Sequence, residues 1–260
     1  MKAIGIIAIA ALIGTPASAA DMAVKAPPPP PPDAAPISDW TGVYFDAGVG
    51  WQNARFDWTY TNFAPPQLPF SLTRSGGSIA GHIGYQQQFG WLVVGGEFGT
   101  FASMNGPASV TSKGVATGPC ADVVGLVCQA SIASADLAGA KLGVDWGDWL
   151  VYGVGGDVFK SSIETHVSSI ATDFGQPNSA HGWYAGGGFD YLLYKSNPFD
   201  VIVGVEYQHL KLDTVTECSV NNIGIVGGCP GTIAAASRLV SATEDAVWGK
   251  VTLKFNPFSH

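Results

Sequence analysis

The chain has 260 residues, of which 47% are hydrophobic and 12% are charged, and its formal net charge is −8 at pH 7. An acidic chain with so few charges lacks the basic surface that nucleic-acid binding requires. Glycine is abundant, with 34 residues, and this composition disfavours long helices. After the N-terminus, no segment approaches the roughly 18 uninterrupted apolar residues of a transmembrane helix. The apolar residues must therefore fill a soluble core or alternate along strands that face lipid.

The N-terminus has the pattern of a secretory signal peptide, which we predict for residues 1–20. One lysine precedes an apolar run from Ala3 to Ile13, and small residues follow at Ala17–Ala20. A positive charge, a short apolar core and an A-x-A site are the marks of such a peptide. The mature chain is therefore expected to be exported.

Residues 21–39 are expected to form a periplasmic linker. Pro27 to Pro32 are consecutive prolines, which adopt the stiff polyproline II conformation and cannot join a central strand. The linker is interpreted as a plain tether, and a contact with peptidoglycan or a partner is the alternative.

Eight segments between Trp40 and Phe255 alternate apolar and polar residues with the period of a β-strand. In chain order the predicted strands are Trp40–Trp51, Gly77–Gln87, Leu92–Gly99, Ile132–Val144, Leu150–Val158, Trp183–Tyr191, Val201–Gln208 and Val247–Phe255. In the fifth strand the apolar face consists of Leu150, Tyr152, Val154 and Val158. The last strand sets Val247, Val251, Leu253 and Phe255 against Lys250, Thr252 and Lys254.

Long and short connections alternate between these strands. The short turns lie near Gln88–Gly90, Asp145–Asp148 and Lys195–Pro198, and the long loops are Ala54–Ser75, Ala102–Ser131, Lys160–Ala180 and Asp213–Thr243. Short periplasmic turns and long extracellular loops are typical of bacterial outer-membrane barrels. We therefore predict an all-β fold, an eight-stranded antiparallel up-and-down transmembrane β-barrel over residues 40–255. A soluble periplasmic barrel of lipocalin type is the alternative.

Aromatic residues gather near the short-turn end, which predicts an interfacial girdle. The eight residues are Trp40, Phe89, Trp91, Trp146, Trp149, Tyr194, Phe199 and Phe255. Residues 256–260 follow the last strand, and Pro257 cannot extend its ladder. They are expected to hang below the barrel as a C-terminal tail.

Several short strings resemble a known family. They are Trp40–Tyr44 after a Pro-rich linker, Trp149–Tyr152, Val205–Tyr207 and the terminal V-x-L-x-F of Val251–Phe255. The chain resembles the small eight-stranded outer-membrane proteins of α-proteobacteria, the porin-family or outer-membrane β-barrel domain. The resemblance implies a major surface protein with structural and host-interaction roles. It also allows haem binding, with which some relatives are credited.

Seven polar residues are predicted to form a layer in the barrel lumen, about five or six residues from the periplasmic end of their strands. They are Asp46, His82, Glu97, Lys141, Asp190, Glu206 and Lys250. An eight-stranded barrel is just wide enough for side chains to fill. A hydrogen-bonded structural plug is the favoured interpretation, and a conducting path with cation preference is the alternative.

The four cysteines fall in two of the long loops, Cys120 and Cys128 in one, Cys218 and Cys229 in the other. Four cysteines allow three pairings. Pairing within each loop, Cys120 with Cys128 and Cys218 with Cys229, encloses the shortest chain segments. Disulfides also suit an exported protein. Metal binding is the rival interpretation, but no histidine lies at ligand spacing near either pair.

No catalytic or cofactor-binding motif accompanies the five histidines. We expect no enzyme, no cofactor and no metal. The predicted function is an integral protein of the bacterial outer membrane with a structural or surface-interaction role, and a small cation-preferring porin or channel is the alternative. The expected partners are outer-membrane lipid and the barrel assembly machinery, together with a host surface or peptidoglycan.

Overall fold

The computed structural model describes residues 38–60, 68–111, 127–169, 172–174, 178–196, 198–217 and 238–255. The eleven strands are β1 (Gly42–Tyr60), β2 (Phe70–Phe89), β3 (Leu92–Ser103), β4 (Ala108–Thr111), β5 (Val127–Trp146), β6 (Trp149–Ser169), β7 (Thr172–Phe174), β8 (Asn178–Ser179), β9 (Gly182–Tyr194), β10 (Phe199–Glu217) and β11 (Arg238–Phe255). No helix in these ranges is long and apolar enough to cross a membrane. The predicted signal peptide, nearly all of the linker and the tail lie outside the described residues.

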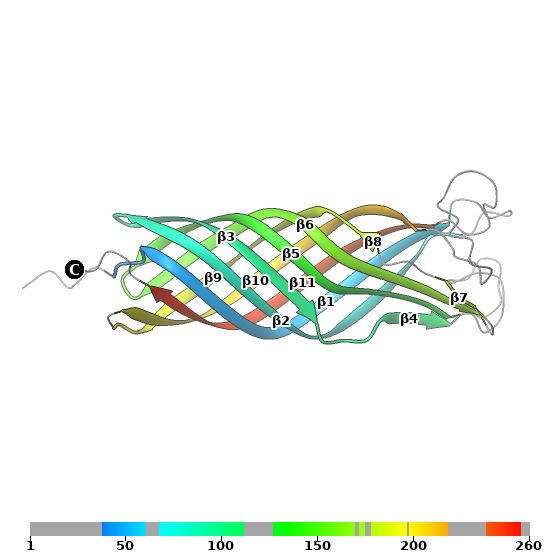
Figure 1. Cartoon of the computed structure of the whole chain (residues 1–260), viewed down its shortest axis with the longest axis horizontal. Coiled ribbons are helices and arrows are strands. Elements are labelled where there is room, and N and C mark those ends of the chain that lie inside the picture. Colours follow the sequence, from blue (N-terminus) through cyan, green and yellow to red (C-terminus); the bar gives the residue numbers. More distant parts are fainter. Residues whose placement is uncertain are drawn as a thin grey trace, which may run out of the picture. The chain divides into compact units, whose positions relative to one another are not determined.

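Eight of the strands close into a ring in the order β1-β2-β3-β5-β6-β9-β10-β11, and every neighbouring pair is antiparallel. β1 and β11 close the ring with a register that runs from Val43 opposite Phe255 to Tyr60 opposite Arg238. Figure 1 shows the strands side by side and tilted in the same sense. The predicted eight-stranded antiparallel up-and-down barrel is confirmed.

The three short strands extend this ring at the end opposite the short turns. β4 follows a break in β3 and pairs with the beginning of β5. β7 and β8 both pair with the second half of β6, and they lie toward the right of Figure 1 with β4. The connections at this end are therefore partly built of strand.

Two of the short turns depend on glycine. Gly90 and Gly147 have φ values of 63° and 72°, and each lies in a two-residue connection between paired strand ends. Tight hairpin turns need this left-handed backbone, which glycine adopts without steric cost. These turns fix the register of the β2–β3 and β5–β6 hairpins.

The strands are longer than the sequence pattern predicted, and the four loops are correspondingly shorter. β1 continues to Tyr60, β10 continues to Glu217, and β11 begins at Arg238. The prediction failed because the polarity of the two faces inverts partway up several strands, of which β1 is the clearest case. Below the inversion β1 points Phe45, Val49 and Trp51 outward, whereas above it Ala54, Phe56 and Trp58 are buried inside.

The apolar face of the fifth predicted strand points into the barrel, unlike the apolar face of the last strand. Leu150, Tyr152, Val154 and Val158 of β6 point into the barrel and are buried. Their neighbours on the other face include exposed Val151 and exposed Asp157. Both faces of this strand carry valine and glycine, so alternation alone could not orient it. The pairing of Trp146 with Trp149 across the turn fixes its register.

The predicted aromatic girdle holds for seven of its eight members. These lie on the outer surface, with exposed fractions from 37% for Phe199 and Phe255 to 80% for Trp146. Trp40 is the exception: it is 1% exposed and lies among the buried residues inside the ring. Trp40 continues the alternation of β1 on the same inward face as Tyr44 and Asp46, so its parity already separated it from the outward-facing aromatic residues.

Candidate functional site

The interior of the barrel has three levels, and the lowest is a cluster around Trp40 at the short-turn end. The Trp40 indole N–H donates to Oδ1 of Asp145 at 3.1 Å, and its backbone N–H donates to Oε1 of Gln88 at 2.7 Å. The amide of Gln86 donates to the Trp40 carbonyl at 2.7 Å. Trp40 is thereby tied to both β2 and β5. We call this group, together with Lys254 and Asp200, the mouth cluster.

Lys254 binds the segment before β1 on the opposite side of the mouth cluster. Its ammonium group is fully buried and lies 3.0 Å from Oδ2 of Asp200. It also donates to the carbonyl oxygens of Asp39 and Thr41. The segment that precedes β1 is therefore bonded to β2 and β5 on one side of the ring and to β11 on the other. It crosses the short-turn end of the lumen.

The second level contains all seven residues of the predicted polar layer. They come from seven different strands of the ring, and β6 contributes none of them. Each is 9% exposed or less. In chain order they are Asp46, His82, Glu97, Lys141, Asp190, Glu206 and Lys250. Alternation with glycine and apolar neighbours made them recognisable in the sequence, and the closed ring brings them together.

Lys250 is the centre of the charge network. Its ammonium nitrogen lies 2.9 Å from Glu206, 3.5 Å from Asp190 and 3.8 Å from Asp46. Lys141 lies 3.2 Å from the other oxygen of Asp190. Each lysine thus pairs with a carboxylate from another strand, and neither residue spacing nor a sequence motif would have predicted these pairs.

Three tyrosines complete the layer, and the sequence prediction omitted them. The Tyr44 and Tyr184 hydroxyls donate to the two oxygens of Glu97 at 2.9 and 3.2 Å. The Tyr152 hydroxyl donates to Glu206 at 2.7 Å, and its ring lies 3.8 Å from the Lys141 ammonium. Tyr44 and Tyr184 lie on the lumen face beside predicted layer residues, which was the available signal. Tyr152 was missed because it belongs to the face of β6 that the sequence pattern assigns as apolar.

The polar layer carries more negative than positive charge. Four carboxylates face two ammonium groups, which leaves a formal charge of −2 when His82 is neutral. Burying unbalanced charge is costly unless it is paired, protonated or bound to a cation. The hydroxyl donors of the tyrosines lower that cost but do not cancel the charge.

His82 is held in one orientation by Asp46. Its Nδ1 lies 2.7 Å from Oδ1 of Asp46, and its backbone N–H donates to the same oxygen at 3.1 Å. Among the described residues its Nε2 atom is buried without a hydrogen-bond partner. One ring nitrogen is therefore committed, and the other faces the interior of the layer.

The third level, which we call the upper core, is apolar. Most of it lies in the part of the barrel in which the strands exceed their predicted lengths. Its members include Phe56, Trp58, Phe101, Ile132, Leu137, Ile163, Leu210, Leu212, Val240 and Ala242. Trp248 lies at its lower boundary, where its indole N–H donates to Ser78 at 2.9 Å.

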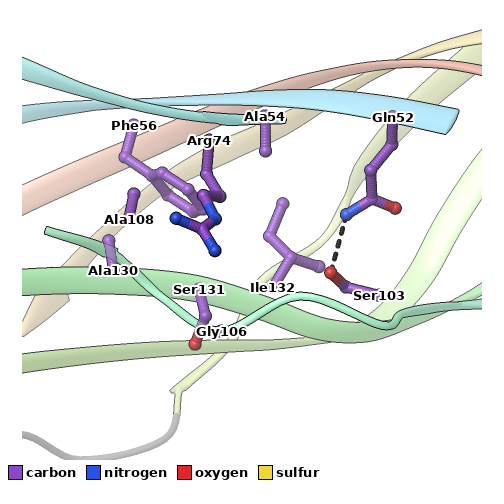
Figure 2. A pocket seen from close by; sticks show the side chains of 10 residues that line it. All are labelled: Gln52, Ala54, Phe56, Arg74, Ser103, Gly106, Ala108, Ala130, Ser131 and Ile132. Carbon is purple, nitrogen blue, oxygen red and sulfur yellow. Dashed lines mark hydrogen bonds between the residues drawn. The ribbon is translucent and has the colours of Figure 1, made fainter. Parts of the chain in front are cut away.

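A small pocket opens where β3 breaks before β4. Figure 2 shows Phe56 and Arg74 entering it together, and the Gln52 amide bonded to Ser103 at 2.8 Å. Its remaining lining residues are Ala54, Gly106, Ala108, Ala130, Ser131 and Ile132. The free space is about that of one water molecule, far below a typical ligand pocket. The pocket is too small to hold a ligand.

Of the four predicted disulfide residues, the described part of the chain contains Cys128. Cys128 is buried near the beginning of β5. Cys120, Cys218 and Cys229 lie outside the described residues. The pairing within each loop stays a prediction.

No protein-family model matches the chain, and no curated protein matches it. Among solved structures it is similar to the outer membrane protein OprG from Pseudomonas aeruginosa, with 14% identity, 83% of this chain and 97% of that chain covered, and a TM-score of 0.41. It is also similar to Neisserial surface protein A, with 11% identity, 83% and 98% covered, and a TM-score of 0.35.

A third similar structure is the outer membrane protease OmpT from Escherichia coli, with 10% identity, 86% of this chain and 99% of that chain covered, and a TM-score of 0.40. With identities and TM-scores this low, nothing about activity follows for this chain. The absence of enzymatic activity stays a prediction.

Proposed function

We propose that the chain is an integral outer-membrane protein whose barrel is a closed anchor and whose long-loop end is a surface-interaction face. The outer surface carries a continuous apolar band, which spans residues 43–51 on β1 and 247–255 on β11. Nine residues match the roughly 9–11 that a transmembrane β-strand needs. Beyond this band β1 presents Asn53, Arg55 and Asp57 to the outside.

Aromatic side chains border both edges of the band. The girdle of seven residues marks the short-turn edge, and exposed Trp51, Trp183 and Tyr207 mark the other. Paired aromatic girdles are typical of barrels that sit in a bilayer. The band thereby supports a lipid environment over the soluble lipocalin-type alternative.

The observation that carries the proposal is the filling of the lumen. The mouth cluster, the polar layer and the upper core follow one another along the interior. The named residues of the polar layer and the upper core are all buried, and the mouth cluster joins buried Trp40 and Lys254 to half-buried Asp145. The two lysines of the polar layer are ion-paired with its aspartates and Glu206, and Glu97 accepts hydrogen bonds from two tyrosines. Such an interior suits an anchor.

A small channel is the second candidate, favoured by one observation. The excess of carboxylates in the polar layer would make any conducting form prefer cations. The same excess is also compatible with a closed plug. Conductance therefore separates the two candidates.

The remaining parts of the proposal follow from the predicted export signal and the loops. Outer-membrane lipid and the barrel assembly machinery are the proposed partners during insertion. A host surface is the proposed partner of the loops, and peptidoglycan is the proposed partner of the linker. Haem capture is a lesser candidate, for which a spectral titration with haem is the test.

The deciding experiment is a planar-bilayer recording on the refolded mature chain. Insertion is verified first by heat-modifiable migration in gels, which also distinguishes a membrane barrel from a soluble one. The anchor predicts no steady conductance above the bare bilayer. Steady cation-selective steps would replace the anchor with the channel, and steady anion-selective steps would contradict both.

A further inference from the structure

We infer that the polar layer binds one divalent transition-metal ion of the zinc class, with Nε2 of His82 and a carboxylate oxygen from each of Glu97 and Glu206 as ligands. This inference does not depend on whether the barrel anchors or conducts. It differs from the expectation of no metal, which was based on the absence of a metal-binding motif in the sequence.

The three ligand atoms converge although they come from β2, β3 and β10. They all lie within 4.8 Å of one another. Zinc binds nitrogen and oxygen ligands at about 2.0–2.2 Å, so tetrahedral ligands lie about 3.4 Å apart. Small side-chain rotations bridge this difference. All three residues are buried, with exposed fractions of 7%, 5% and 2%.

The orientation of His82 is the observation that points to a ligand. Asp46 accepts the Nδ1–H hydrogen bond at 2.7 Å, which leaves the lone pair of a neutral imidazole on Nε2. That atom is buried and has no partner among the described residues. A carboxylate that fixes one nitrogen of a histidine while the other binds metal is the usual outer-shell arrangement.

Both glutamates retain coordinating capacity. Glu97 accepts from Tyr44 and Tyr184, one hydroxyl on each oxygen, and each carboxylate oxygen has a second lone pair. Glu206 accepts from Gln208 at 2.6 Å on Oε1 and from both Lys250 and Tyr152 on Oε2, so its free lone pair is on Oε1. These donors hold both carboxylates in place without using all their lone pairs.

The charge of the layer matches a divalent cation. Four carboxylates and two ammonium groups give a formal charge of −2, which one divalent ion would cancel. A single proton on His82 would leave a charge of −1 buried. The imidazole ligand selects a transition metal, because magnesium and calcium prefer oxygen ligands alone.

The strand beside His82 leaves room for its imidazole ring. Gly99 of β3 is its cross-strand partner, and a β-carbon at that position would lie 2.0 Å from Cδ2 of the imidazole. Any larger residue would therefore displace the proposed nitrogen ligand. A bound ion would connect β10 to β2 and β3, from which it is separated around the ring.

The test is metal content after refolding the untagged mature chain in detergent with excess zinc, followed by removal of free metal on a chelating resin. Refolding in the presence of metal avoids any limit on access to the closed lumen. We expect about one zinc per wild-type chain by elemental analysis. Cobalt in place of zinc should give the visible absorption of a four-coordinate site.

The variants are His82→Gln and Glu97→Gln, with His209→Gln as the matched control. His209 has the same Nδ1 contact to a carboxylate, 2.8 Å from Asp245, but lies outside the layer. Zinc content should fall at least tenfold in the two layer variants and stay unchanged in the control.

Either of two results would overturn the inference. One is a wild-type barrel that migrates as folded and yet carries neither zinc nor the cobalt absorption. The other is full retention of metal by folded His82→Gln and Glu97→Gln chains. If both variants fail to fold, the cobalt spectrum of the wild type decides alone.

Discussion

The part of the barrel near the short turns, which we call the lower part, and the part near the long loops, the upper part, have opposite distributions of polarity. The same strands build both parts. On lower β1, Phe45 and Val49 point outward while Asp46 is buried. On upper β1, Arg55 and Asp57 are exposed while Phe56 is buried. β11 changes in the same way, from buried Lys250 to buried Ala242.

The difference shows how one alternating pattern can satisfy two surroundings. Where lipid covers the outside, apolar residues must face outward and the interior can be polar. Where water covers the outside, apolar residues must face the interior, because burial of their surface stabilises the fold as it does in a soluble barrel. The interchange occurs within one strand without a change of register, because side chains alternate at every residue.

The largest expected effect comes from breaking the charge balance of the lower part. Lys250→Met leaves the carboxylates of Glu206, Asp190 and Asp46 facing one another without this ammonium group. Removing one partner of a buried ion pair costs about 3–5 kcal/mol. We expect a loss of that size in the free energy of unfolding, measured with urea in lipid vesicles.

Lys160→Met is the control for this prediction. Lys160 is exposed on β6, so its replacement should change the free energy of unfolding by less than about 0.5 kcal/mol. Equal effects of the two substitutions would show that the polar layer is not a buried network.

A second prediction addresses the upper core. Leu212→Ala removes a side chain that is 1% exposed and should cost about 3 kcal/mol. Because the upper part is built like a soluble barrel, hydrogen exchange should accelerate there and not at the polar layer. Lys211→Ala, at the adjacent exposed position, should leave exchange unchanged. Acceleration spread evenly over both parts would mean that they unfold as one unit.

The boundary between the two parts contains a buried acid and gives a pH prediction. Glu244 lies inside the barrel above the apolar band, and neither of its carboxylate oxygens has a partner among the described residues. Burial, with repulsion from Asp245, raises the pKa of Glu244 from 4.5 to about 8. The folded state therefore holds this proton more tightly than the unfolded state.

Stability from Glu244 should be fully present below pH 4.5 and should be lost as the pH rises through about 8. Glu244→Gln should remove this pH dependence, which we expect to be on the order of 2 kcal/mol after water enters beside the ionised group. Unfolding of both chains at pH 4 and pH 9 measures it. The same loss in the variant would assign the dependence to another group.

The smallest expected effect concerns the outer surface of the upper part. Burial acts to raise the pKa of Asp57, but hydrogen bonds from Ser71 and Arg55 and the Arg55 charge hold it below its usual value. The pair is exposed, so Asp57→Asn should cost at most about 0.5 kcal/mol at neutral pH. This contribution should vanish as the pH falls below the ordinary carboxyl pKa. A cost that persists in acid would point to lost packing instead.

The sequence predicted the lower part well because its charged residues stand out against apolar and glycine neighbours. Asp46, Glu97 and Lys250 each break an otherwise apolar strand, so their common face and height were readable. The closed ring then places them within contact distance. Alternation and strand count were sufficient for this much.

The upper part was missed for a physical reason. Ala54, Phe56 and Trp58 continue the alternation of β1, but on the opposite face from Val49 and Trp51. A search for one apolar face therefore ends the strand at Trp51. The proposed metal ligands were missed because they come from three strands, and no local spacing records their convergence.

The central claim is that lipid surrounds the lower part alone, with its edge near Trp51. Paramagnetic relaxation of backbone amides in nanodiscs tests it most directly, with one spin label in the lipid chains and another in water. We predict that the chain label relaxes residues 43–51 and 247–255 whereas the aqueous label relaxes residues 53–59 and 241–245. Equal relaxation of both sets by either label would contradict the account.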